Sequence, residues 1–166
     1  MVVDIFNTDK KYKVIYADPP WNYKDKALSG NRGAGCKYPV MSTEDICKLP
    51  VNELATDDSI LFMWATFPNI AEALKVIEAW GFIYKTAGFV WVKKNKNSWS
   101  NFWGMGAYTR ANTEVCLLAI REGTKAKQIV KDHGVHQIIE SRIEEHSKKP
   151  AETRDRITRL TGGGYL

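Results

Sequence analysis

The sequence predicts an α/β fold built on a mixed β-sheet, and two patterns support this prediction. In the first half, short apolar runs alternate with amphipathic, helix-like segments, which is typical of parallel strands joined by helices. In the second half, three apolar runs follow one another without a clear helix between them, so part of the sheet is expected to be antiparallel. The chain has 166 residues, which is the length of one domain.

Five apolar segments are expected to form the strands. The first, residues 14–17, ends abruptly at two prolines, which cannot continue a strand ladder. The other four are residues 59–65, 88–92, 114–120 and 137–140. Two long stretches between elements, residues 22–40 and 94–109, show no regular pattern. Loops of this length are often functional, so we expect both to cover a site.

Three helices are expected, each with recognisable ends. They run from an N-cap at Ser42 to Leu49, from Pro68 to Gly81, and from Pro150 to Leu160 before Gly162. The second helix has its apolar residues on one face: Ile70, Ala73, Leu74, Ile77 and Trp80.

Composition excludes several classes of protein. Hydrophobic residues make up 44% and charged residues 26%, which argues against a disordered chain. The longest apolar run, residues 60–65, is far shorter than the roughly 20 residues that span a bilayer, and no signal peptide begins the chain, so no membrane partner is expected. The three cysteines lack disulfide or zinc spacing and are interpreted as reduced thiols of a cytoplasmic protein. The pair His133 and His136 has no third ligand nearby in sequence, so no metal is expected.

The net charge of +5 is unevenly distributed along the chain. Residues 1–83 contain nine basic and eleven acidic residues, whereas residues 84–166 contain fifteen basic and eight acidic residues. A basic half is compatible with a polyanionic partner such as nucleic acid, although many solvated surfaces are basic too.

The tetrapeptide Asp18-Pro19-Pro20-Trp21 directly follows the first predicted strand, where α/β sheets bind ligands. The prolines would hold the Pro19 carbonyl rigidly beside the Asp18 carboxylate, and two fixed acceptors can bind both hydrogens of an –NH2 group. Trp21 would offer a flat surface for an aromatic ring. These residues therefore predict a site that holds the amine of a heteroaromatic ring opposite an electrophile. The alternative is a Pro-Pro turn that ends the strand above a buried Trp.

This tetrapeptide resembles the catalytic signature of the MT-A70 family of adenine-N6 methyltransferases. Further segments resemble that family in the same order along nearly the whole chain: residues 37–42, 61–66, 89–93, 113–116 and 147–150, together with the Asp4-Ile5 pair. The resemblance implies a Rossmann-like S-adenosylmethionine-dependent methyltransferase fold with permuted motif order. It also implies S-adenosyl-L-methionine as cofactor and nucleic acid, DNA more than RNA, as substrate.

The resemblance also implies roles for individual residues. The catalytic residues would be Asp18, Pro19, Pro20 and Trp21, with Trp21 flanking an extruded base. The cofactor would contact Asp4, Ile5, Asp18, Ser147 and Lys149, and the substrate would contact Tyr38, Lys93 and Glu114.

Structural alternatives stand beside some of these roles. Lys93 would otherwise be an ordinary strand-end lysine and Glu114 a strand cap, while Trp64 and Trp91 are expected in the core. The aromatic residues between positions 99 and 108 would stack on bases or close their own loop.

The end of the chain departs from the family pattern. A strand that follows the last helix in the family has no counterpart here, so we expect residues 1–166 to form a single methyltransferase domain that is C-terminally short. An uncovered sheet edge would invite a homodimer or a partner subunit. Two other functions remain open. One is a catalytically weak or inactive member that binds nucleic acid or a partner, and the other is RNA adenine methylation. Methylation of a protein glutamine is disfavoured by Asp18 and Trp21.

Overall fold

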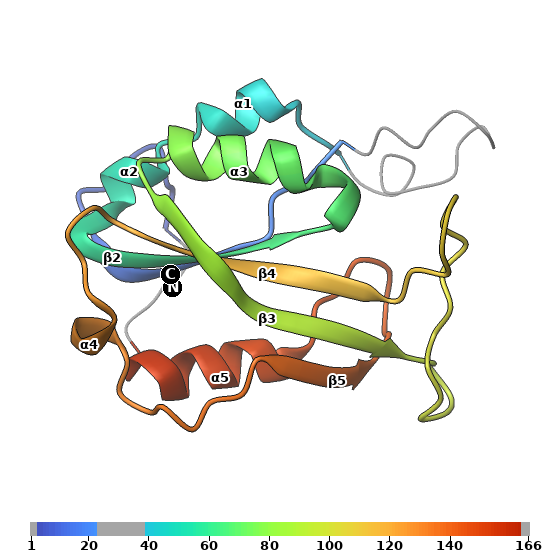
Figure 1. Cartoon of the computed structure of the whole chain (residues 1–166). Helices are drawn as coiled ribbons and strands as arrows, with labels where there is room; N and C mark the ends of the chain where they lie inside the picture. The colour runs from blue at the N-terminus through green and yellow to red at the C-terminus, as the bar shows by residue number, and fades with distance from the viewer. Residues whose placement is uncertain (1–2, 23–38, 164–166) are drawn as a thin grey trace.

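The structure is a computed structural model that describes residues 3–22 and 39–163 (Figure 1). The strands are β1 (Tyr12–Ala17), β2 (Ala55–Ala65), β3 (Ile83–Lys94), β4 (Thr113–Ile120) and β5 (Ile138–Arg142). The helices are α1 (Thr43–Cys47), α2 (Val51–Leu54), α3 (Ile70–Ala79), α4 (Ala126–Ile129) and α5 (Ala151–Thr161), and a 3₁₀ turn, η2 (Phe67–Asn69), leads into α3.

The strands form one sheet in the order β1-β2-β4-β3-β5. β1 runs parallel to β2, and β3 runs parallel to β5. β4 lies between β2 and β3 and is antiparallel to both, because no helix crosses over between β3 and β4. The expected mixed sheet is therefore confirmed.

Helices cover both faces of this sheet (Figure 1). α1, α2 and α3 lie on one face, and α4 and α5 lie on the other. Successive residues of β2 point to opposite faces, so Leu61 and Met63 belong to the first hydrophobic core and Phe62 and Trp64 to the second. β2 is consequently buried on both sides, as its continuous apolar run requires.

The predicted helix ends are largely confirmed. The Ser42 side chain accepts a hydrogen bond from the Asp45 backbone and caps α1. Gly81 follows α3 with φ of 82°, and Gly162 caps α5 with φ of 84°, a left-handed conformation that glycine adopts easily. On α3 the expected apolar face is wrong at Leu74, which is 38% exposed, because Val76 takes the buried position.

Two structural observations bear on membrane insertion and on association with a partner chain. Within residues 3–22 and 39–163, no helix combines the length and the apolar character needed to cross a bilayer. β1 forms one edge of the sheet, and among the described strands only β2 pairs with it. The homodimer or partner subunit expected at an uncovered edge stays a prediction.

Candidate active site

Four of the predicted site residues meet at one end of the sheet, where the carboxyl ends of β1 and β3 lie. Asp18 directly follows β1, Lys93 lies near the end of β3, and Glu114 lies near the start of the antiparallel β4. Lys149 immediately precedes the residue that caps α5. Because β4 runs the other way, its amino end lies beside the carboxyl ends of its neighbours, where α/β sheets bind ligands.

A tight turn holds the tetrapeptide after β1. The Trp21 backbone N–H donates to the Pro19 carbonyl at 2.9 Å, which closes a three-residue turn. The Met41 N–H donates to the Pro20 carbonyl at 3.0 Å and fastens the turn to the segment that leads into α1. The Pro19 carbonyl keeps a second lone pair, so it can still accept a hydrogen bond from a ligand.

Trp21 does not present the stacking surface that the sequence suggested. Its side chain is 3% exposed and belongs to the core beneath α1 and α3. The indole Nε1–H donates to the Trp64 carbonyl at 2.9 Å, which satisfies the one polar atom of the buried ring. Trp21 therefore anchors the turn from below, and the expectation that it flanks an extruded base is wrong.

Asp18 is the titratable group at the centre of the site. Its side chain reaches solvent at the mouth of a pocket, but the surrounding protein raises the pKa of the carboxyl to about 6. Burial contributes most of this rise, because a less polar surrounding disfavours the charged form. Lys149 opposes the rise and the negative charge of Glu114 adds to it.

A first pocket, which we call the Asp18 pocket, has a volume of about 510 Å³. Both charge signs line it, with Asp18 and Asp155 on the acidic side and Lys148, Lys149 and Arg154 on the basic side. The remaining lining residues are Tyr16, Ala17, Ser147, Pro150 and Ala151. Ser147 has a positive φ of 63°, a strained conformation that turns the chain between β5 and α5 around this pocket.

Glu114 joins two lysines that the sequence placed far apart. Its carboxylate lies 2.8 Å from Lys93 Nζ through Oε1 and 2.8 Å from Lys149 Nζ through Oε2. Burial alone would raise the pKa of Glu114, but Lys149 and Lys93 outweigh it and hold the pKa below the usual value. Glu114 is thus a charged bridge, and neither it nor Lys93 is an ordinary strand-end residue.

Two tryptophans form the floor beneath this bridge. Lys149 Nζ lies 5.6 Å from the Trp64 ring centroid, and Lys93 Nζ lies 5.1 Å from that of Trp91. The two rings meet edge to face at 6.3 Å. Both tryptophans are buried in the second core, as expected. The core therefore fixes the position of both lysines.

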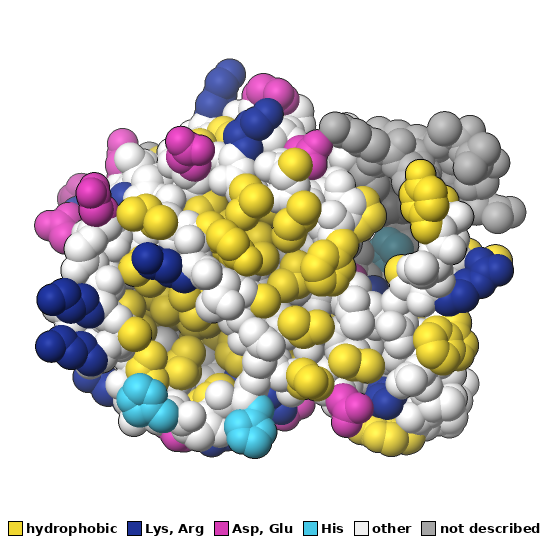
Figure 2. Space-filling model, in the orientation of Figure 1, with side chains coloured by type: hydrophobic (Ala, Val, Ile, Leu, Met, Phe, Trp, Pro, Cys, Tyr) yellow, Lys and Arg dark blue, Asp and Glu magenta, His cyan; other side chains and the backbone are white. Residues whose placement is uncertain are grey.

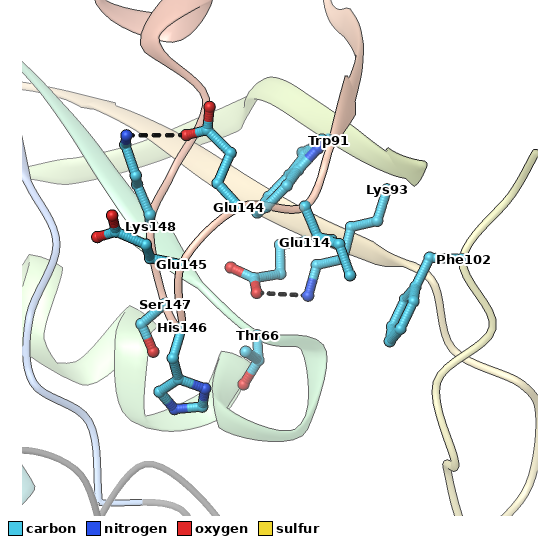
Figure 3. Close-up of a pocket in the computed structure, with 11 residues that line it drawn as sticks. Thr66, Trp91, Lys93, Phe102, Glu114, Glu144, Glu145, His146, Ser147 and Lys148 are labelled. Atoms are coloured by element: carbon cyan, nitrogen blue, oxygen red, sulfur yellow. Dashed lines mark ion pairs between the residues drawn. The ribbon is translucent and has the colours of Figure 1, made fainter. Parts of the chain in front are cut away.

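A second pocket, the Glu114 pocket, has a volume of about 320 Å³ and shares Ser147 and Lys148 with the first. Figure 3 shows Lys93 and Glu114 meeting inside it, with Phe102 on one side and Ser147 and His146 on the other. The Thr66 hydroxyl also lines it and is buried without a hydrogen-bond partner among the described residues. An unsatisfied hydroxyl beside a charged pair suits a polar ligand.

Comparison with known proteins identifies the family. The MT-A70 family model matches residues 12–163, which is most of the chain. The chain belongs to the MT-A70 family. It is therefore a methyltransferase, and both the resemblance seen in the sequence and the predicted methyltransferase fold class are confirmed.

Three curated relatives of this MT-A70 chain differ in length. The type II methyltransferase M.MunI of Mycoplasma sp. is 36% identical, with 91% of this chain and 68% of that protein aligned. An N(6)-adenosine-methyltransferase MT-A70-like protein of Medicago truncatula is 26% identical, over 92% of this chain and 23% of that protein. The N6-adenosine-methyltransferase non-catalytic subunit MTB of Arabidopsis thaliana is 27% identical, over 84% of this chain and 17% of that protein.

Not every predicted residue reaches the two pockets. Asp4 Oδ1 accepts a hydrogen bond from the Phe6 N–H at 2.9 Å in a local turn, and neither Asp4 nor Ile5 lines either pocket. Tyr38 lies outside the described residues. Conversely, the sequence did not single out Thr66 or Arg154; the position of Thr66 directly after a strand was the available signal.

Proposed function

We propose that this MT-A70 methyltransferase transfers a methyl group from S-adenosyl-L-methionine to the exocyclic N6 amine of adenine in nucleic acid. The observation that carries the proposal is the Asp18 carboxylate, which precedes a rigid turn and lines a pocket that shares Ser147 and Lys148 with the Glu114 pocket. DNA is favoured over RNA because the match to the bacterial type II enzyme has higher identity than the matches to the plant adenosine methyltransferase proteins.

The Asp18 pocket suits the cofactor in size and charge. Its volume of about 510 Å³ falls within the range of roughly 300–1,000 Å³ for small-molecule sites. The cofactor bears a carboxylate, an ammonium and a sulfonium, and the pocket offers cations and carboxylates to match them. Lys149 would pair with the methionine carboxylate while it keeps its bond to Glu114, because an ammonium has three donors. Ser147 would contact the same part of the cofactor.

When bound, S-adenosyl-L-methionine supplies an electrophilic methyl group on sulfur. Asp18 and the Pro19 carbonyl accept hydrogen bonds from the target amine and return electron density to its nitrogen. Pro20 keeps that carbonyl in place, because its ring fixes the backbone. The amine nitrogen that receives this methyl group must release one proton, because the methyl group takes the place of one N–H hydrogen. The Asp18 carboxylate, with a pKa of about 6, is placed to accept that proton.

The Glu114 pocket would receive the target base. Lys93 and Glu114 present a donor and acceptors, and Thr66 adds a hydroxyl without a partner among the described residues. Phe102 offers an aromatic side to the same pocket. Contact of Tyr38 with the base and of Asp4 and Ile5 with the cofactor adenine remain parts of the proposal that these pockets do not include.

Incubation with radiolabelled S-adenosyl-L-methionine and DNA or RNA, followed by nucleoside analysis, tests the proposal. We expect label in N6-methyladenine, and we expect Asp18→Asn to lower the rate about 100-fold or more, because the amine loses a charged acceptor. Asp57→Asn, an exposed aspartate at the far end of β2, is the matched control and should retain the wild-type rate. Lack of turnover on either nucleic acid, together with no cofactor binding by calorimetry, would refute the proposal.

A further inference from the structure

The connection between β3 and β4, residues 95–112, folds into an arm that extends past the end of the sheet (Figure 1). The Asn95 N–H donates to the Ser100 carbonyl at 2.9 Å, and the Gly104 N–H donates to the Ala111 carbonyl at 2.8 Å. These bonds join parts of the segment to one another, and residues 95–112 contain no helix or strand, as their irregular sequence predicted. We call this segment the aromatic arm.

The aromatic arm exposes its large side chains. Trp103 is 60% exposed and Tyr108 is 100% exposed, and Trp99 and Met105 also face solvent. Large apolar side chains in contact with water are unfavourable, and a group of them on one segment marks an interaction surface.

The charge on the arm is entirely positive. Residues 94–113 contain no carboxylate, and Lys96, Arg110 and the neighbouring Arg142 are exposed. None of these three forms an ion pair with a residue that the structure describes. Figure 2 shows hydrophobic and basic side chains side by side on this part of the surface. Aromatic faces interspersed with unpaired cations complement bases and phosphates.

The arm begins at the Glu114 pocket. Phe102 lines that pocket, and its backbone N–H bonds the Lys93 carbonyl at 2.9 Å. Trp103 is the next residue along the chain, so its backbone adjoins the residue that lines this pocket. Trp99 is braced by Lys94 and Arg142, each 5.7 Å from its ring centroid, which leaves Trp103 and Tyr108 as the open aromatic surfaces.

We propose that the aromatic arm binds unpaired nucleotides that flank the target adenine, an inference that rests on the proposed function. Bases stack on Trp103 and Tyr108, and phosphates contact Lys96, Arg110 and Arg142. The nucleotides must be unpaired because both faces of a base inside a duplex are already covered by its neighbours. The enzyme should therefore bind a single strand more tightly than the matching duplex.

The test measures binding and catalysis separately in the double variant Trp103→Ala/Tyr108→Ala. Binding is measured by fluorescence anisotropy with a labelled 12-nucleotide single-stranded DNA, the RNA of the same sequence, and the DNA duplex. We expect the Kd for the single strand to rise about 10- to 100-fold, in line with the loss of base stacking. The KM for the oligonucleotide should rise with kcat unchanged, and Trp103→Phe/Tyr108→Phe should restore binding.

Tyr84→Ala is the matched control, since Tyr84 is an exposed aromatic residue at the start of β3, away from the arm. It should leave the Kd unchanged. An unchanged Kd in the arm variant, or an equal loss for single strand and duplex, overturns the inference. So does an arm variant that changes the oligomeric state in ultracentrifugation and keeps the wild-type Kd, since the arm would then bind protein.

Asp18→Asn separates this inference from the proposed function. It should lower methyl transfer about 100-fold or more, and it should leave the Kd for a single strand without adenine at the wild-type value, because such a strand offers Asp18 no target amine and Asp18 lies outside the arm. If the wild-type protein binds through Trp103 and Tyr108 yet methylates neither DNA nor RNA, the proposed function fails and the binding role of the arm is upheld. If it methylates and the arm variant keeps its KM, the arm inference alone fails.

Discussion

The surroundings of Asp18 shift the pKa of its carboxyl in opposite directions. Burial raises it most, Lys149 lowers it, and Glu114 raises it again. A carboxyl with a pKa of about 6 is still ionised at neutral pH, so it can accept hydrogen bonds from an amine. The same value makes it a better proton acceptor than an ordinary aspartate.

The pH dependence of methylation should reveal this value. The competent form is the carboxylate, so kcat/KM should fall as the pH is lowered through about 6, tenfold per pH unit below it. An ordinary aspartate would place this limb near pH 4. Glu114→Gln removes a charge that raises the pKa of Asp18, so its limb should move to lower pH. A limb near pH 4 in the wild-type enzyme would contradict the environment described for Asp18.

The pH dependence of the free energy of unfolding provides an independent test of the raised pKa of Asp18. Its pKa is higher in the folded than in the unfolded chain, so the folded state binds the proton more tightly. The free energy of unfolding should therefore fall as the pH rises from about 4 to about 6. Asp18→Asn should abolish this fall and unfold at a higher temperature than the wild-type protein at pH 8. The control Asp57→Asn should follow the wild-type curve.

At the scale of elements, the aromatic arm depends on glycine where two backbone segments approach closely. A Cβ on Gly104 would overlap the carbonyl oxygen of Ala111, which accepts the Gly104 N–H. Gly104→Ala should therefore break this bond and loosen the arm without disturbing either core. Since such a bond contributes about 1 kcal/mol, trypsin should cleave after Lys96 and Arg110 roughly fivefold faster.

Gly134→Ala is the control for this prediction. Gly134 also lies in a loop, but the nearest atom to its added Cβ belongs to the adjustable side chain of Asp132. Its proteolysis pattern and melting temperature should match those of the wild-type protein. Equal cleavage of the Gly104→Ala and wild-type proteins would mean that the close approach does not hold the arm together.

Elements with local signals were predictable from the sequence, and those without them were not. α3 and α5 each begin near a proline and end at a glycine, so their limits are encoded locally. α2 and α4 have four residues each, and neither is directly preceded by a Ser, Thr, Asp or Asn that would mark its beginning in the sequence. β2 begins at Ala55, earlier than expected, because its pairing with β1 starts there, at Tyr12.

The candidate site also contains one part that the sequence predicted and another that it did not. Asp18 and its prolines are consecutive, so their chemistry could be inferred from the sequence. The bridge from Lys93 through Glu114 to Lys149 forms only through strand pairing and the docking of α5, which composition does not encode. Trp21 was misassigned for the same reason, since its burial depends on Trp64, 43 residues away in sequence.

For the whole molecule, the central feature is one sheet shared by two hydrophobic cores. Ile77 of α3 is 1% exposed in the first core, and Ile157 of α5 is fully buried in the second. β2 contributes neighbouring side chains to both cores, so displacement of this one strand would open both of them. The site lies where both layers meet the strand ends, and it requires both to be intact.

Unfolding should consequently be a single transition in which the two cores act together. Ile77→Ala and Ile157→Ala should each lower the free energy of unfolding by about 2–5 kcal/mol, measured by urea denaturation with circular dichroism. Because the two side chains lie on opposite faces, the double variant should lose the sum within about 0.5 kcal/mol. Leu74→Ala, at a partly exposed position of α3, should cost much less. A biphasic curve for Ile157→Ala would show instead that α5 unfolds on its own, and the position of Lys149 would then not depend on the rest of the sheet.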